Sequence, residues 1–202
     1  IEDVVLDKKF SIAHIGSLVK SRNPEVLWRV LNFLLDNHSQ NNFNKEKFAQ
    51  DLEIKLVGKV DISVKESIKK YKLENFIKYI DYLPHDEVIH VQQQSQVLLL
   101  LLNNTPNAKM ILTGKFFEYL AAKRPVLCIG PTDGDAAEIV KETKCGVISD
   151  FFDFETLKES IIKYYSNFCD NKLNVENEGI EKFSRRNITK DLVKILNKII
   201  LK

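Results

Sequence analysis

The sequence predicts an α/β protein with an open parallel sheet of about six strands, helices on both faces of the sheet, and further helices at the C-terminus. Three observations lead to this prediction. Strand-like and helix-like segments alternate along the chain, which is typical of parallel strands joined by right-handed helical crossovers. Two of the strand-like segments end in a glycine, at Gly16 and Gly58. The run Val97–Leu102 is apolar throughout, as expected for a strand covered on both faces.

The first half of the chain opens with a predicted strand over 10–16. Pro24 then starts a helix, because apolar residues recur behind it at helical spacing: Val26, Leu27, Val30, Leu31 and Leu34. The elements that follow are expected to be a polar loop over 37–44, a strand over 52–58, a helix over 63–71, a strand over 76–82 and a helix over 84–94.

The second half continues the alternation. We expect a strand over 97–102, a helix over 112–123, a strand over 125–130, a helix over 135–142 and a strand over 146–149. After Phe154 the chain is expected to be helical. The last helix has an apolar stripe flanked by lysines, namely Leu192, Ile195, Leu196, Ile199 and Ile200 beside Lys190, Lys194 and Lys198. We therefore expect a Rossmann-like domain over 10–175, a linker or the remnant of a preceding domain over 1–9, and C-terminal helices over 176–202.

Composition sets wide limits on function. The 202 residues are 44% hydrophobic, which is enough to bury a core, and the net charge of +2 gives no reason to expect nucleic acid as a partner. The three cysteines, Cys128, Cys145 and Cys169, form neither a close pair nor a metal-ligand spacing. Reduced thiols in a cytoplasmic protein are the simplest interpretation. Because the chain begins at Ile1, we expect a fragment or a processed product.

The loop after the first strand is the first candidate site, because open α/β sheets bind ligands at the carboxyl ends of their strands. It carries two cations, Lys20 and Arg22, just before a predicted helix N-terminus. Cations are disfavoured there, since the helix end already has partial positive charge. A bound anion would remove the conflict. The alternative is that both side chains are solvated loop charges.

The second candidate is the segment Thr113-Gly114-Lys115 at the start of a predicted helix. Thr113 could cap the helix, Gly114 would let a ligand approach the backbone, and Lys115 adds a cation at a helix start. Glu118 follows one turn later, and its side chain leans back toward the helix N-terminus. Its carboxylate could accept hydrogen bonds from both hydroxyls of a ribose. The alternative is that Glu118 pairs with Lys115 or Lys123 on a solvated face.

Other polar residues are weaker candidates. Asp133, Asp135 and Glu138 could at first sight hold a metal, but Asp135 followed by Glu138 is better explained as a helix cap. His85 is expected to be solvated or to cap a helix, and His14 is expected to lie in the core. The sequence has no recognisable nucleophile signature, no Walker-type phosphate loop and no Gly-x-Gly-x-x-Gly after the first strand.

Four segments, in this order and spacing, resemble one known family: "HIGSLVKSRNPEVL", "YIDYLPHDEVIHVQQQSQVLLLLL", "TGKFFEYLAAKRPVL" and "GPTDGDAAEIVKETKCGV". Over residues 10–202 the chain is similar to the C-terminal domain of two-domain glycosyltransferases of the GT-B fold, close to the glycosyl transferases group 1 (family four). The resemblance implies a domain that binds a nucleoside diphosphate sugar, the donor. It also implies an N-terminal, acceptor-binding domain that this chain lacks.

The resemblance also implies roles for individual residues. It assigns the donor diphosphate to residues of both candidate loops, namely Lys20, Arg22, Thr113, Gly114 and Lys115. Glu118 would bind the ribose hydroxyls, and Leu83 and His85 would line the base. The family often has two glutamates eight positions apart, and Met110 stands at the earlier position. This departure leaves the donor sugar and the stereochemistry of transfer open.

The whole enzyme is thus expected to be a hexosyltransferase-type glycosyltransferase of bacterial polysaccharide biosynthesis. It would move a sugar, with retention, to a glycan or lipid-linked acceptor, and this chain by itself would be inactive. No cofactor, metal or nucleic acid is expected. The expected location is the cytoplasm, with peripheral association at the inner face of the membrane. Two alternatives remain: a sugar-nucleotide-binding module without transfer chemistry, and half of a sugar-nucleotide epimerase.

Overall fold

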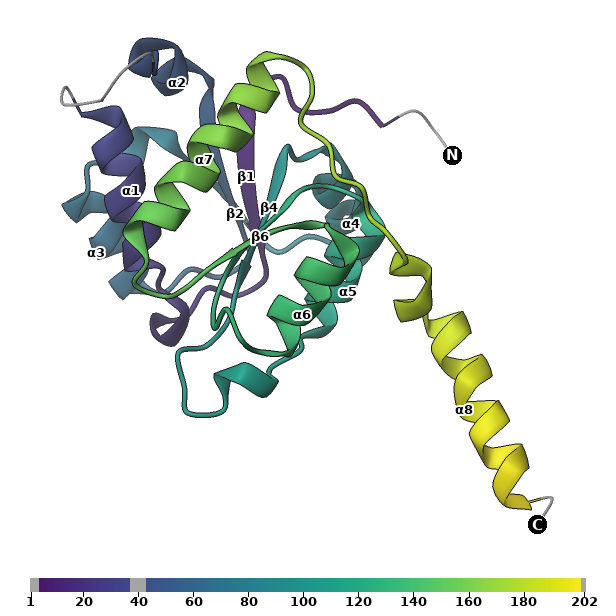
Figure 1. The fold of residues 1–202 in the computed structure, drawn as a ribbon. Coiled ribbons are helices and arrows are strands. Elements are labelled where there is room, and N and C mark those ends of the chain that lie inside the picture. Colours follow the sequence, from purple (N-terminus) through teal and green to yellow (C-terminus); the bar gives the residue numbers. More distant parts are fainter. Residues whose placement is uncertain (1–3, 37–42, 201–202) are drawn as a thin grey trace.

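The computed structural model describes residues 4–36 and 43–200 and confirms the expected parallel α/β sheet (Figure 1). The six strands lie in the order β3-β2-β1-β4-β5-β6. Their bounds are β1 (Phe10–Ile15), β2 (Leu52–Val57), β3 (Ile77–Ile80), β4 (Val97–Leu101), β5 (Val126–Ile129) and β6 (Gly146–Ser149). The first three residues of the predicted linker, and residues 37–42 of the predicted polar loop, lie outside the described residues.

The order of the strands reverses between β1 and β4. These two strands are neighbours in the sheet, although β2 and β3 lie between them in the sequence. These strands pair only at Ile12 with Val97 and at Ala13 with Leu98, whereas β1 pairs with β2 along its whole length. Where the strand order reverses, a crevice opens at the carboxyl ends of the two strands, and ligands of doubly wound sheets bind in this crevice.

Helices cover both faces of the sheet (Figure 1). The α-helices of the described residues are α1 (Glu25–Leu35), α2 (Lys45–Asp51), α3 (Ile62–Lys70), α4 (His85–Gln94), α5 (Gly114–Ala122), α6 (Asp135–Thr143), α7 (Phe154–Cys169) and α8 (Arg185–Ile200). Short 3-10 turns are η1 (Lys20–Arg22), η2 (Glu74–Phe76), η3 (Ala108–Met110) and η4 (Ile180–Phe183).

Each face of the sheet has its own core. Trp28 and Phe48 are fully buried on the face covered by α1, α2, α3 and α7. Phe116 and Tyr119 are fully buried on the face covered by α4, α5 and α6. Burying a side chain of this size stabilises the fold by roughly 1.5–3 kcal/mol, so both layers hold the strand ends in place.

Two segments differ from the sequence-based expectation. Helix α2 has only one buried residue, Phe48, so it lacks the apolar periodicity of a longer helix. Its start is fixed by Asn44, whose side chain accepts a hydrogen bond from the Lys47 amide at 2.9 Å. The expectation of continuous helix after Phe154 is wrong, because α7 ends at Cys169 and Asn171 turns the chain with φ +57°.

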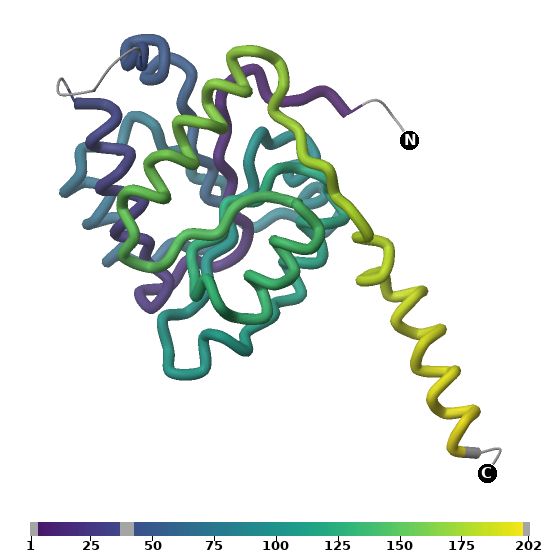
Figure 2. The backbone as a smooth tube through the Cα atoms, viewed as in Figure 1, coloured from purple at the N-terminus to yellow at the C-terminus, as the bar shows by residue number. Residues whose placement is uncertain are grey.

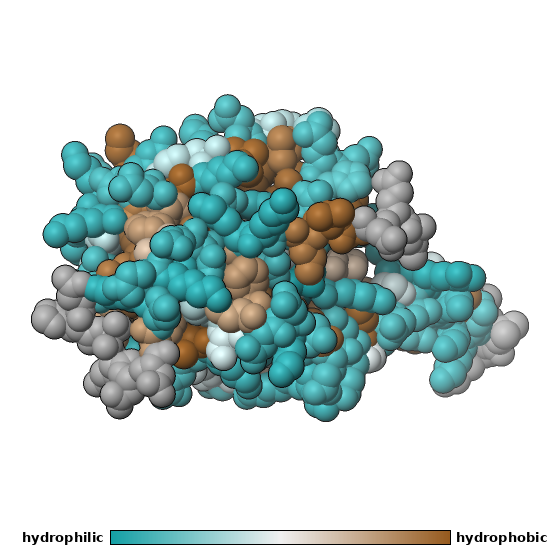
Figure 3. All heavy atoms as spheres, turned by 90° about the horizontal axis from the view of Figure 1, so that it is seen from above, coloured by the Kyte–Doolittle hydropathy of each residue, from teal (hydrophilic) through white to brown (hydrophobic). Residues whose placement is uncertain are grey.

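In Figure 2 the N-terminal segment and α8 both lie on the right-hand side of the domain, the first near its top and the second at its bottom. The N-terminal segment runs past the amino ends of the strands, where Asp7 pairs with the buried ammonium of Lys55 at 2.5 Å. Seen from that side, the surface is mainly hydrophilic (Figure 3). Helix α8 instead extends beyond the carboxyl ends of the strands (Figure 1). No helix in the described residues is both long and apolar enough to cross a membrane.

Candidate functional site

Two cations meet at the crevice. The chain turns after β1 at Gly16, and the Lys115 side chain of α5 lies over this turn. Burial, and secondly the nearby Arg22 guanidinium, lower the pKa of Lys115 from 10.5 to about 8, against a smaller opposite effect of Glu118. Within the described residues, neither Arg22 nor Lys115 has a carboxylate within ion-pair distance. This combination of positive charge and burial favours an anionic ligand.

Side chains take over from strand pairing where β1 and β4 separate. The Ile15 amide donates to the Tyr119 hydroxyl of α5 at 3.2 Å. On the other strand, the Leu99 carbonyl lies 3.1 Å from Nδ1 of His14 and accepts its proton. His14 is 1% exposed, which confirms its predicted place in the core. Its pKa is nevertheless lowered by two cations of the crevice, Lys115 and Arg22, in addition to the larger effect of burial.

Buried polar atoms without a hydrogen-bond partner gather around this crevice. In the described part of the chain there are five such side-chain atoms. One of them, Nε2 of His14, lies in β1, and three more belong to the segments that follow β1 and β4: Nε of Arg22, Oδ1 of Asn103 and Oγ1 of Thr113. An unpaired buried polar atom costs roughly 1–3 kcal/mol, and such atoms in native structures call for an explanation. A polar ligand at this edge would provide one.

The N-terminus of α5 opens onto the same edge. Thr113 occupies the N-cap position, but the prediction that its side chain caps the helix is wrong, because that side chain accepts no hydrogen bond from the first turn. A Cβ placed on Gly114 would meet nothing within 4 Å, so the space before the helix is open. The helix end is therefore accessible to an anion, with Lys115 beside it.

Glu118 lies in a small pocket between α4 and α5. The pocket, of about 150 Å³, is lined by His85, Ile89, Gln92, Gln93, Glu118, Ala121 and Ala122. Oε2 of Glu118 accepts a hydrogen bond from Nε2 of the buried Gln92 at 3.1 Å. No lysine of the described chain pairs with Glu118, so its carboxylate remains exposed to a ligand. The structure thus brings His85 and Glu118 together, whereas Leu83 packs on the core beneath them.

Lys20 is not among the cations that act on Lys115 and His14. It is exposed on η1, and its charge acts on the Asp61 carboxylate at the start of α3, whose pKa it helps to lower behind the hydrogen bonds from Ser63. Arg22 lines a second pocket, of about 190 Å³, together with Arg29, Asn104 and Phe152. Sequence reasoning did not single out Asn104 or Phe152, because neither belongs to a charged or glycine-rich motif.

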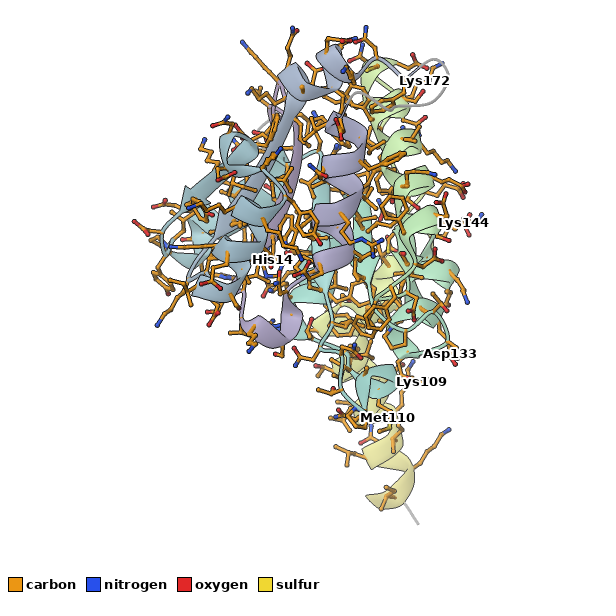
Figure 4. The ribbon with its side chains drawn as sticks, turned by 90° about the vertical axis from the view of Figure 1, so that its left-hand side faces the viewer. His14, Lys109, Met110, Asp133, Lys144 and Lys172 are labelled. Carbon is orange, nitrogen blue, oxygen red and sulfur yellow. The ribbon has the colours of Figure 1, made fainter. Side chains whose placement is uncertain are left out.

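The loop from β4 to α5 is held against the start of α6 (Figure 4). Lys109 pairs with Asp133 at 2.5 Å. A Cβ on Gly134 would lie 2.6 Å from the Lys109 carbonyl oxygen, so only glycine allows this approach. Gly134 is also the N-cap residue of α6, which begins at Asp135. The prediction that Asp135 caps this helix is thus wrong by one position. Met110, at the tip of this loop, is 71% exposed.

Metal ligands and disulfides add nothing to this site. Within residues 4–36 and 43–200, no cluster of three or more His, Cys, Asp and Glu side chains could hold a metal ion. Asp133 is engaged with Lys109 instead. Cys128, Cys145 and Cys169 are free thiols, as the sequence predicted, and burial raises the pKa of Cys128 and Cys145.

Glycosyltransferases are among the solved structures with the same fold. A glycosyltransferase from Rickettsia africae matches with a TM-score of 0.69 and 19% identity, over 96% of this chain and 48% of that one. HepE from Anabaena, in complex with UDP-glucose, matches with a TM-score of 0.64 and 14% identity, over 95% of this chain and 49% of that one. The C-terminal domain of LpcC, a glycosyl transferase group 1 family protein from Francisella tularensis, matches with a TM-score of 0.61 and 12% identity, over 91% of this chain and 89% of that one.

These likenesses establish the fold. The chain spans about half the length of the two larger proteins. A comparison with curated sequences gave no match. The family assignment comes from the sequence itself, because the family model described as glycosyl transferases group 1 matches residues 2–181. The chain therefore belongs to the glycosyl transferases group 1 family.

Proposed function

We propose that this chain is the donor-binding half of a glycosyltransferase and that it binds a nucleoside diphosphate sugar at the carboxyl edge of its sheet. One observation carries the proposal: Lys115, at the open N-terminus of α5 and near the unpaired Arg22, lies one helical turn before Glu118, which shares a pocket with His85. A diphosphate fits the first group, and a ribose with its base fits the second.

The chemistry assigned to these residues is electrostatic. When the bond between sugar and diphosphate breaks, negative charge develops on the departing phosphate. Arg22, Lys115 and the amides at the start of α5 would stabilise that charge, because these groups are already oriented toward it and need not rearrange as water would. Thr113 and Gly114 would supply the close approach to the backbone, and Lys20 would add charge at the outer rim. In this proposal no metal ion carries that charge.

The rest of the reaction belongs to the part of the enzyme outside this chain. HepE, which shares the fold, has been solved with UDP-glucose, and this supports a hexose nucleotide as the donor. The acceptor, a glycan or a lipid-linked glycan in bacterial polysaccharide biosynthesis, would bind an N-terminal domain. Transfer with retention, a cytoplasmic location and peripheral contact with the inner face of the membrane complete the proposal.

Calorimetric titration of the 202-residue chain tests it. The ligands are UDP, GDP and ADP, their glucose or mannose derivatives, and the matching monophosphates as controls. We expect saturable binding of at least one nucleoside diphosphate and much weaker binding of its monophosphate, which lacks the second phosphate. The proposal fails if none of the diphosphates binds at millimolar concentration. Epimerisation of a bound nucleotide sugar without an acceptor would instead indicate half of an epimerase.

A further inference from the structure

We propose that His14 belongs to the anion site and takes up a proton when a diphosphate binds, so that the ligand meets a third positive charge from beneath. The inference rests on the proposed function to the extent that a diphosphate must lie between Arg22 and Lys115. It adds a residue that lies inside the sheet, below the loops that hold the ligand.

His14 lies in β1 next to the last residue that pairs with β4, Ala13. Its side chain reaches the Leu99 carbonyl on the other strand. The histidine is thus held from one side where the two strands stop pairing, and it is labelled inside the sheet in Figure 4.

The hydrogen-bond partners of the His14 ring show which of its nitrogens carries a hydrogen. A carbonyl can only accept, so Nδ1 of His14 carries the hydrogen that Leu99 receives. In the neutral ring Nε2 then has no hydrogen and carries a lone pair. This atom is buried without a hydrogen-bond partner. Nothing in the strand pairing requires such an atom, because a leucine or valine would fill a purely apolar position without this cost.

Two cations surround the ring of His14. Burial, the ammonium of Lys115 on α5 and the guanidinium of Arg22 on η1 lower the pKa of His14 from 6.5 to about 3, against the hydrogen bond to Leu99, which acts the other way. No other charged group of the described residues contributes to this shift. A diphosphate between the two cations cancels their repulsion and adds attraction, while the effect of burial remains. The pKa of His14 therefore rises when the ligand binds.

Nuclear magnetic resonance of the imidazole nitrogens tests the inference directly. The protein is labelled with ¹⁵N-histidine and measured at pH 6.0, free and saturated with inorganic pyrophosphate and, separately, with the best nucleoside diphosphate. At this pH Lys115 is charged in both states, since its pKa is about 8. We expect His14 to show one protonated nitrogen in the free protein and two in the complex. The signals of His14 are assigned by their loss in His14→Gln.

Calorimetry supplies a second measurement. A nucleoside diphosphate sugar has no phosphate proton that titrates near pH 6, so proton uptake measured in buffers of different ionisation enthalpy comes from the protein. We expect uptake that is present in the wild-type chain and lost in His14→Gln. Equal uptake by both proteins, or a ring that stays singly protonated in the saturated complex, overturns the inference.

The two proposals fail in different ways. If pyrophosphate binds but no nucleotide binds with added affinity, the donor-binding proposal fails, while the state of His14 is still measured in the pyrophosphate complex. If nucleotide binds and His14 stays neutral, only the role of His14 fails. If neither ligand binds, both proposals are wrong.

Discussion

The ammonium of Lys115 lies directly over the backbone of Gly16, so closely that a Cβ on Gly16 would be 3.0 Å from Nζ. Gly16 has a φ of +100°, which residues with a side chain rarely adopt. The loop after β1 and the first turn of α5 are therefore fitted to each other through a lysine and the absence of a side chain.

Gly16→Ala should damage both the fold and the anion site. The strained backbone should cost about 1–3 kcal/mol of unfolding free energy, and the methyl group should push Lys115 aside. We expect a lower midpoint of thermal unfolding and weaker binding of pyrophosphate. Gly114→Ala is the matched control for stability, because a Cβ there meets no atom within 4 Å. Equal unfolding midpoints for the two variants would contradict this view.

Diphosphate binding should weaken as the pH rises through about 8, the pKa of Lys115 in the free protein. An anion prefers the charged amine, so binding raises this pKa and takes up a proton where the free amine is neutral. Below that pH the lysine is charged in both states and this dependence disappears. Titrations with a nucleoside diphosphate sugar from pH 6.5 to 9.5 measure it. In Lys115→Met the part of the dependence centred near pH 8 should vanish along with part of the affinity. A variant that keeps the wild-type pH profile would show that another group is responsible.

Glu118→Ala should separate the nucleoside from the phosphates. We expect nucleoside diphosphate affinity to fall by about 1.5–3 kcal/mol, the usual size of lost charged hydrogen bonds, and pyrophosphate affinity to stay unchanged. Glu118→Gln is the matched control for stability, because it can still accept the hydrogen bond from Gln92. Lys20→Ala and Arg22→Ala should instead weaken both ligands. If Glu118→Ala binds nucleotide as well as the wild type, Glu118 is a surface charge.

Helix α8 should pack against protein rather than lie on a membrane. Its apolar stripe is solvent-exposed in this chain, with Leu192, Ile195 and Ile199 each more than half exposed at 53%, 56% and 67%. The side chain of Ile200, which the sequence also placed in the stripe, lies outside the described residues. We expect no flotation with anionic liposomes at physiological salt. Salt-sensitive flotation that is lost in the double variant Lys194→Glu, Lys198→Glu would show that α8 binds lipid.

The 202-residue chain should bind a nucleoside diphosphate and yet transfer no sugar. The donor loops are present, while the chain covers only about half of the larger glycosyltransferases that share its fold. The measurement is incubation of a bound nucleotide sugar with candidate glycan acceptors, followed by mass spectrometry. Robust transfer by this chain would refute the idea that a second domain supplies the acceptor site.

The fold followed from the sequence because its signals are local and repeated. Apolar runs such as Val97–Leu102, and the glycines after the first two strands, locate strands without knowledge of their neighbours. Helix α2 was not predicted, because a helix with one buried residue has no periodic pattern of apolar residues. The cap of α6 escaped because the close approach of Lys109 to Gly134 joins residues far apart in the sequence.

The site was predictable in its charges but not in its arrangement. Motifs pointed to Arg22, Lys115 and Glu118, and these three lie around one edge of the sheet. Sequence reasoning placed Lys20 beside Arg22, yet the short η1 turn directs its charge toward Asp61. His14 looked like a core residue because burial can be read from a strand pattern, whereas a missing hydrogen-bond partner cannot.

The short pairing between β1 and β4 has a consequence for how the molecule moves. Residues 10–80 build one half of the sheet and residues 97–149 build the other, and two pairs of residues join them along the strands. Strand pairing is thus shortest along the line between the halves, and we expect slow opening events to follow it. A ligand bound to both Arg22, which follows β1, and Lys115, which follows β4, would connect the two halves. Amide hydrogen exchange along β1 and β4 should therefore slow on ligand binding far more than exchange at the outer strands β3 and β6.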